Sequence, residues 1–196
     1  IIAEINIKDE DVNRNVRILN SAQEFLREYP SSWLKDKIYN NEGEIKQCEI
    51  RINDEIIPFN YFYKFKSKGK YTIKYSFKNN IKNASFMFSY CDLLTKINLT
   101  NFNSNDIISV LCMFNGCKSL TDINLSNFNT NNVNIMMHMF YDCLSLTHIN
   151  LSNFNTNNAT NMSWMFDGCS SLTKIDLSNF ITDKVTDMSC MFGRCK

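Results

Sequence analysis

Cysteine is the residue type whose number and spacing in this chain point most directly to chemistry. The chain has 8 Cys, which could close disulfides, bind zinc or pack as free thiols. Five of them recur at one constant interval: Cys91, Cys117, Cys143, Cys169 and Cys195. A zinc site needs converging ligands at short spacings such as Cys-x-x-Cys, and no such pair occurs. A disulfide needs thiols that face each other, whereas side chains in one column of a repeat point in parallel. The spacing therefore favours buried structural thiols, with a disulfide or a metal site as the alternatives.

The two histidines do not complete a catalytic arrangement. His138 and His148 have no carboxylate, Ser or Cys partner at a spacing typical of nucleophilic catalysis. Glycine numbers only 5, and no phosphate-binding or dinucleotide-binding motif is present. The net charge of +1 gives no electrostatic basis for binding nucleic acid or an anionic membrane. We therefore expect a non-enzymatic protein with no cofactor and no metal.

The cysteine interval belongs to a longer repeat. Met-Phe occurs five times at the same interval, beginning at Met87-Phe88, and columns of Leu, Ile and Phe follow it. The repeat defines four units and part of a fifth: residues 81–106, 107–132, 133–158, 159–184 and 185–196. A repeat period of roughly 20 to 29 residues with Leu-x-x-Ile-x-Leu is typical of leucine-rich repeats. No unit can bury its apolar side alone, so each needs a neighbour.

Each unit is expected to hold one short strand and one short helix or helical turn. Ile123 and Leu125 alternate as in a strand. Val133, Met136 and Phe140 are spaced three and four apart, which is typical of a helix. Glycine follows Met-Phe in two units, where a helix C-terminal glycine belongs. The predicted fold is an α/β leucine-rich-repeat solenoid, with a parallel sheet on one side and short helices or helical turns on the other.

Two further columns are expected to stack between units. One is an aromatic spine: Phe102, Phe128, Phe154 and Phe180. The other is an asparagine ladder that satisfies turn carbonyls: Asn101, Asn127, Asn153 and Asn179. The chain contains 29 Asn, and asparagine suits turns because it tolerates left-handed geometry and bonds nearby backbone groups.

The repeat also resembles a known family. The run Met-Phe-x-x-Cys-x-x-Leu-x-x-Ile-x-Leu-Ser-Asn-Phe resembles the BspA-like leucine-rich repeat family over residues 81–196. The resemblance implies adhesion or protein binding rather than catalysis. The junction between the first and second units departs from the pattern, because Ser104 replaces the usual Thr and Asn105-Asp106-Ile107 replaces the usual junction that ends in Val.

Residues 1–80, which we call the N-terminal part, do not repeat and carry most of the charge. They hold 14 Lys and Arg and 12 Asp and Glu, against 7 and 8 in the remainder. Strands are expected at residues 1–8, 15–19, 45–52, 56–65 and 71–77. Ser21 and Glu24 form a capping box before a helix that ends near Pro30. We predict a small N-terminal α+β capping domain over residues 1–80, whose last strand, residues 71–76, lies against the first repeat as a pseudo-rung.

The predicted functional surface is the exposed face of the repeat strands. Core columns keep their residue type, whereas the column at positions 96, 122, 148 and 174 varies, because packing leaves it free. We expect this concave sheet to bind a partner protein. The candidate partner-binding residues are Lys96, Asn98, Asp122, Asn124, His148, Asn150, Lys174 and Asp176. The opposite side, with Trp164 and His138, is the alternative surface.

Two other functions stay open, a cell-surface adhesin and a regulatory or targeting module of a larger protein. The chain starts at Ile1 and stops in mid-pattern, which indicates a piece of a longer protein. An unpaired cysteine ladder favours the cytoplasm, and the family resemblance favours the cell surface. We expect a monomer whose partner is another protein, with no nucleic acid and no membrane insertion.

Overall fold

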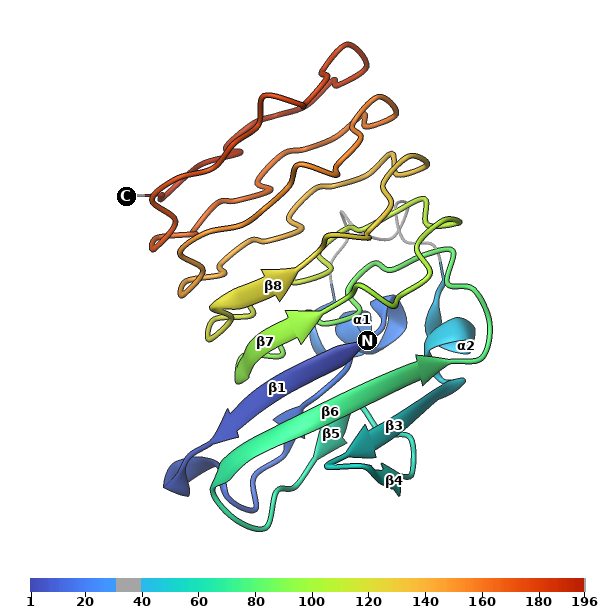
Figure 1. Cartoon of the computed structure of the whole chain (residues 1–196), viewed down its shortest axis with the longest axis vertical. Helices are drawn as coiled ribbons and strands as arrows, with labels where there is room; N and C mark the ends of the chain where they lie inside the picture. Colours follow the sequence, from blue (N-terminus) through green and yellow to red (C-terminus); the bar gives the residue numbers. More distant parts are fainter. Residues whose placement is uncertain (31–39, 196) are drawn as a thin grey trace.

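The computed structural model describes residues 1–30 and 40–195 (Figure 1). A six-stranded mixed sheet is built from strands between residues 2 and 124, in the order β4-β3-β6-β1-β7-β8. A second sheet pairs β2 with β5. The strands are β1 Ile2–Ile7, β2 Val16–Arg17, β3 Cys48–Ile52, β4 Glu55–Ile57, β5 Phe62–Tyr63, β6 Gly69–Phe77, β7 Leu94–Asn98 and β8 Asp122–Asn124. The helices are η1 Asp9–Asp11, α1 Ala22–Glu28 and α2 Glu42–Ile45.

Strand β1 joins the N-terminal part to the repeats. It pairs antiparallel with β6, where Ile5 faces Tyr71, and antiparallel with β7, where Ala3 faces Ile97. Its alternate residues Ala3, Ile5 and Ile7 are buried, as the period of two in a strand requires. The residues against the first repeat strand therefore belong to β1, whereas residues 71–76 of β6 lie one strand further away (Figure 1).

Several elements of the N-terminal part lie near their predicted positions. Strands β1, β3 and β6 fall within or close to the expected ranges. Helix α1 begins after Ser21, whose Oγ accepts a hydrogen bond from the Glu24 backbone N–H at 3.1 Å. This bond is one half of the expected capping box, and it satisfies one of the free N–H groups of the first turn. The other half does not form, because the Ser21 backbone N–H donates to Asn20 Oδ1 at 2.9 Å.

The predicted α/β leucine-rich-repeat solenoid is wrong. Among the described residues after position 80 there is no helix, and the parallel pairing of named strands is limited to β7 with β8. Strand β8 is the last named strand, so Ile149 and Ile175 lie outside the sheet. The sheet is also mostly antiparallel and includes β1, β3, β4 and β6 from the N-terminal part. The capping-domain prediction had the last strand of residues 1–80 join the sheet of the repeats, whereas four strands of this part share the sheet and β1 is the one beside β7.

Hydrogen bonding explains why the expected helices do not form. In the third unit, the backbone N–H groups use two kinds of acceptor, one in the next unit and one in the same unit. Those of Met136, His138 and Phe140 donate to carbonyl groups in the next unit at 2.9 to 3.1 Å. Those of Met139 and Tyr141 donate to the carbonyl three positions back, as in turns. A helix needs every N–H to bond four positions back, so the ladder between units excludes it.

Left-handed residues make these turns possible. Two columns have positive φ in each unit. One column, with φ from 52° to 62°, contains Phe86, Cys112, His138, Trp164 and Cys190. The other, with φ from 52° to 77°, contains Tyr90, Gly116, Asp142, Gly168 and Arg194. Gly116 and Gly168 thus have the expected backbone geometry without the expected helix. We call the surface made by these turns the turn face.

Side-chain ladders hold equivalent residues together. The rings of Phe88, Phe114, Phe140, Phe166 and Phe192 stack with centroids 5.5 to 5.7 Å apart. The predicted aromatic spine is confirmed for Phe102, Phe128 and Phe154, whose rings stack at 6.2 to 6.3 Å. In the predicted asparagine ladder, Asn127 and Asn179 donate to carbonyl groups of the preceding unit.

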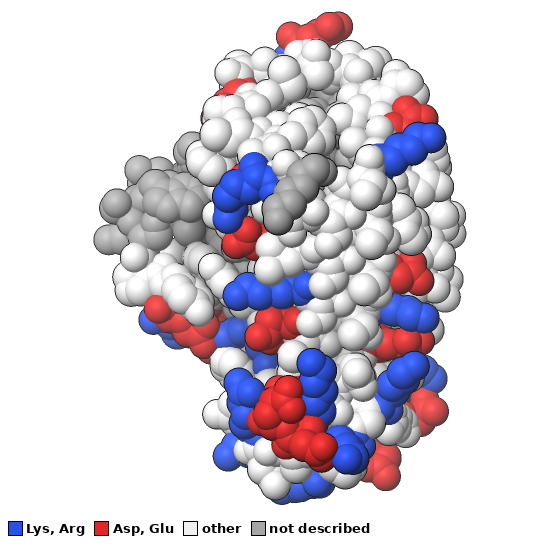
Figure 2. Space-filling model, turned by 90° about the vertical axis from the view of Figure 1, so that its left-hand side faces the viewer, with Lys and Arg blue, Asp and Glu red and all other residues white. Residues whose placement is uncertain are grey.

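Charge is unevenly spread over the molecule. In Figure 2, Lys, Arg, Asp and Glu gather in the lower part of the view, while the upper part is mostly uncharged. This agrees with the higher charge content of the N-terminal part. In the part of the chain that the structure describes, no helix is long and apolar enough to span a membrane.

Candidate functional site

The predicted partner-binding residues lie at the surface. All eight are exposed: Lys96, Asn98, Asp122, Asn124, His148, Asn150, Lys174 and Asp176. Five of them line one hollow of about 410 Å³, together with Ile2 and Glu4 of β1. A second hollow of about 230 Å³ shares Asn150 with the first and adds Asp176. His148 and Lys174 line neither hollow. We call this surface the sheet face.

Sequence reasoning missed the contribution of β1 to the sheet face. Ile2 and Glu4 line the larger hollow, because β1 occupies the place that residues 71–76 were expected to take. The Lys96 ammonium lies 3.7 Å from the Glu4 carboxylate, and both side chains are about half exposed. Such a pair contributes little to stability, so both charges remain accessible to a partner.

The asparagines of the sheet face have a structural role. The Oδ1 atoms of Asn98, Asn124 and Asn150 each accept a hydrogen bond from the backbone N–H two positions later, at 2.9 to 3.1 Å. Asp176 does the same in the fourth unit, and this bond lowers the pKa of its carboxyl group. These turns fix the side chains. The asparagine Nδ2 groups make no protein hydrogen bond among the described residues, so they present a row of fixed donors.

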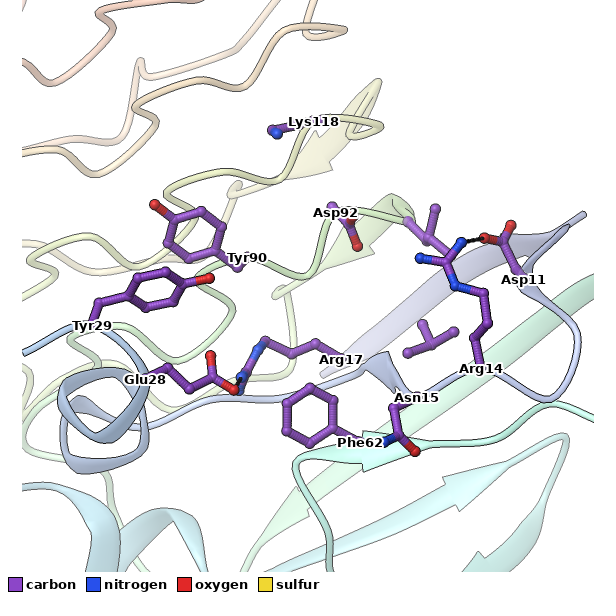
Figure 3. A pocket seen from close by; sticks show the side chains of 12 residues that line it. Asp11, Arg14, Asn15, Arg17, Glu28, Tyr29, Phe62, Tyr90, Asp92 and Lys118 are labelled. Atoms are coloured by element: carbon purple, nitrogen blue, oxygen red, sulfur yellow. Dashed lines mark hydrogen bonds and ion pairs between the residues drawn. The ribbon is translucent and has the colours of Figure 1, made fainter.

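A larger cleft lies where the N-terminal part meets the first two units. It has a volume of about 550 Å³ and lies between α1, residues 11–17 and the loops at Asp92 and Lys118 (Figure 3). The guanidinium of Arg17 pairs with the Glu28 carboxylate and lies 4.2 Å from the Phe62 ring centroid. The side chain of Arg17 is almost fully buried, and through these two contacts it holds β2 against β5 and α1.

The turn face carries an aromatic hollow of about 430 Å³. It is lined by Met137, His138, Tyr141, Ser163, Trp164 and Asp187. The His138 and Trp164 rings are stacked at 5.9 Å, and the His138 and Tyr141 rings meet edge to face at 5.0 Å. Burial lowers the pKa of His138 to about 4, so its ring is neutral near neutral pH. Sequence reasoning named Trp164 and His138 but missed Tyr141. The equivalent positions in the other units, 89, 115, 167 and 193, hold no aromatic residue.

The cysteine column packs as predicted. Cys91, Cys117, Cys143 and Cys169 are buried, and all eight cysteines of the chain are free. The Sγ atoms of Cys117, Cys143 and Cys169 donate to phenylalanine carbonyl groups of the preceding unit at 3.1 to 3.3 Å. Burial raises the pKa of the Cys169 thiol to about 12, which suppresses the reactive thiolate. Among the described residues, no cluster of three or more His, Cys, Asp or Glu side chains could hold a metal ion.

Thiol titration should separate the cysteines by burial. In the folded protein we expect Cys190, which is exposed, to react first with a disulfide reagent, followed by the half-exposed Cys195. The other six thiols are buried and should react only on unfolding, so that all eight react in concentrated denaturant. Cys190→Ser should remove the fast phase alone. Rapid reaction of more than two thiols in the folded protein would contradict this arrangement.

Comparison with family models gives a match to the family described as "Mycoplasma protein of unknown function, DUF285". The match covers residues 59–170 and 124–196, which together span residues 59–196 and include all eight predicted partner-binding residues. No curated protein and no solved structure matches the chain.

Proposed function

This chain belongs to the DUF285 family, and from that premise we propose that its sheet face binds a partner protein without catalysing a reaction. One observation carries the proposal: the column of Lys96, Asp122, His148 and Lys174 varies between units and is exposed in every unit, while the neighbouring inward columns of Ile and Leu keep their residue type. Packing requires the constant columns, whereas the varied residues are free to match a partner. The resemblance of the repeat to the BspA-like family, which implies adhesion or protein binding, adds support.

The sheet face is suited to binding because its side chains are held before a partner arrives. The turns at Asn98, Asn124 and Asn150 fix their amide groups, and ring stacks and backbone hydrogen bonds fix the spacing of the units. A surface that is already ordered loses little conformational entropy on binding. Binding therefore spends little free energy on ordering these residues, and more of the energy of the polar contacts contributes to affinity.

The polar and charged groups of the sheet face indicate which kind of partner surface would match it. Amide donors recur from unit to unit, and between them stand Lys96, Asp122, His148 and Lys174. A matching surface offers hydrogen-bond acceptors opposite the amides, a carboxylate opposite Lys96 and a cation opposite Asp122. Charges arranged in this way set specificity and association rate more than total affinity.

Charge reversal on the sheet face tests this function. The triple variant Lys96→Glu, Asp122→Lys and Lys174→Glu should weaken binding of the partner at least tenfold, because each new charge meets a like charge. Its melting temperature should stay close to that of the parent, because all three side chains are exposed. The measurement is capture from source cells with quantitative mass spectrometry, followed by calorimetry with the purified partner.

A matched control keeps the change in net charge the same. Lys82→Glu, Asp106→Lys and Lys184→Glu alter three exposed residues that line neither hollow of the sheet face. This control should retain the partner. Equal loss in both variants would show a non-specific charge effect, and equal retention would place the binding site elsewhere; either result contradicts the proposal.

A further inference from the structure

Helix α1 shows what kind of structure the turn face accepts. The rings of Phe25 and Tyr29, four positions apart on and just after the helix, stack on Phe86 and Tyr90, with centroids 4.3 and 5.1 Å apart. Phe86 and Tyr90 are also four positions apart, and both have positive φ. One turn of a helix therefore matches the two left-handed positions of one unit. This is an established interface of the folded chain.

The aromatic hollow begins where the contact with α1 ends. Phe86, Leu111, Cys112 and Met137 share an apolar cluster with Phe25. Met137 also lines the aromatic hollow, so the two surfaces are continuous. The hollow continues the same columns, because His138 is equivalent to Phe86 and Cys112, and Trp164 follows it one unit later.

In these later units the columns are not covered by α1. Trp164 is 36% exposed, although it is a large apolar side chain, whereas its equivalents Phe86 and Cys112 are buried. The equivalent positions are buried in the first two units, where α1 packs, and exposed in the fourth. This indicates that the later units offer a similar helix-binding surface that α1 does not occupy. Exposed apolar side chains around a hollow are typical of interaction sites.

The charges beside the hollow indicate the polarity of its occupant. Asp142 and Asp167 bond to Arg194, whose guanidinium lies 5.1 Å from the Tyr141 ring centroid. Asp187 also lines the hollow, and among the described residues it makes no ion pair, although Ser189 and Asn161 donate to its carboxylate. The unmatched carboxylate favours a cation on the occupant.

We propose that the aromatic hollow of the turn face binds an amphipathic helix of a partner protein, which carries two aromatic or large aliphatic residues four positions apart and a Lys or Arg that reaches Asp187. The helix extends along the turn face from the place where α1 stops. This second binding surface is separate from the sheet face, because the two share no lining residue. It also differs in chemistry, since it is aromatic rather than amide-rich.

Selection of helical peptides tests the proposal. The probe is a phage-displayed library of amphipathic helices built on the pattern of α1, selected against the intact chain. We expect enriched peptides with large apolar residues four apart and a basic residue, measured as synthetic peptides by calorimetry. Trp164→Ala should weaken their binding at least tenfold, whereas Trp164→Phe should restore most of it. Asp187→Asn should weaken only those peptides that keep the basic residue.

Two controls make the result specific to this hollow. Leu144→Ala truncates an apolar side chain of similar exposure, 38%, that does not line the hollow, and it should leave binding unchanged. The sheet-face triple variant should also bind the peptides normally, so failure of either proposal is distinguishable from failure of the other. No enriched helix, or equal binding to Trp164→Ala, would overturn the inference. Trp164-dependent dimerisation in sedimentation would overturn it in favour of a second copy of the chain.

Discussion

Phe140→Ala is expected to lower the free energy of unfolding by about 3–5 kcal/mol, because it leaves a cavity in a packed core. Phe140 is fully buried and its ring stacks between Phe114 and Phe166 at 5.6 and 5.5 Å. The backbone N–H of Phe140 also donates a hydrogen bond to the carbonyl oxygen of Met165 in the next unit. Loss of the ring therefore weakens contacts on both sides of the unit. Denaturant unfolding followed by circular dichroism measures the effect.

The same ladder supplies the control. Phe192 stacks on Phe166 at 5.5 Å but is 42% exposed and, among the described residues, has no ring on its other side. Phe192→Ala should therefore cost about 1 kcal/mol or less. If the two variants cost the same, the stacked rings do not carry the packing energy assigned to them.

Ile5→Asp is expected to lower the free energy of unfolding by about 3–5 kcal/mol, because it buries a carboxylate without a partner. Ile5 is 2% exposed in β1, between β6 and β7. The substitution acts at the strand that joins the N-terminal part to the repeats. We therefore expect the whole chain to lose stability in one transition, rather than the N-terminal part alone. Thermal unfolding with probes in both parts measures this.

Ile2→Asp is the matched control, since Ile2 lies in the same strand but is 42% exposed. The control should change stability by about 0.5 kcal/mol or less. Two separate transitions in Ile5→Asp, with the repeats unaffected, would show that β1 does not couple the two parts.

The sequence was sufficient to predict which columns of the repeat form the core. A position that packs in the same way in every unit keeps the same residue type, and the sequence shows this repetition directly. The Phe102 spine and the cysteine column were found in this way. Phe102, Phe128 and Phe154 are buried in successive units, and so are Cys91, Cys117, Cys143 and Cys169. Exposure of the predicted sheet-face residues follows from the same reasoning, because Ile97 and Ile123 point inward and their neighbours outward. These properties depend on local alternation, which a sequence shows directly.

The helices were predicted wrongly because spacing does not show where an N–H group bonds. Val133, Met136 and Phe140 are all buried, as a helical face would be. Their spacing of three and four also suits a chain of turns in which alternate N–H groups bond to the next unit. The choice between the two depends on a neighbour one full repeat away, so local pattern could not decide it.

The position of β1 and the clefts beside it also depended on distant contacts. Alternation predicted that residues 1–8 form a strand, but not that Glu4 would lie 3.7 Å from Lys96. The Arg17–Glu28 pair and the cleft around it arise from the same packing. The aromatic hollow was only partly visible, because Tyr141 stands in a column of otherwise unlike residues.

Site-specific photocrosslinking tests the proposed sheet-face function most directly. A photoreactive phenylalanine analogue placed at Asp122 or His148, both exposed on the sheet face, should form a covalent adduct with one partner protein in source cells. The same analogue at Asn157, which is exposed but lines neither hollow of the sheet face, should form none with that partner. An adduct from Asn157 but from neither sheet-face position would contradict the proposed binding surface.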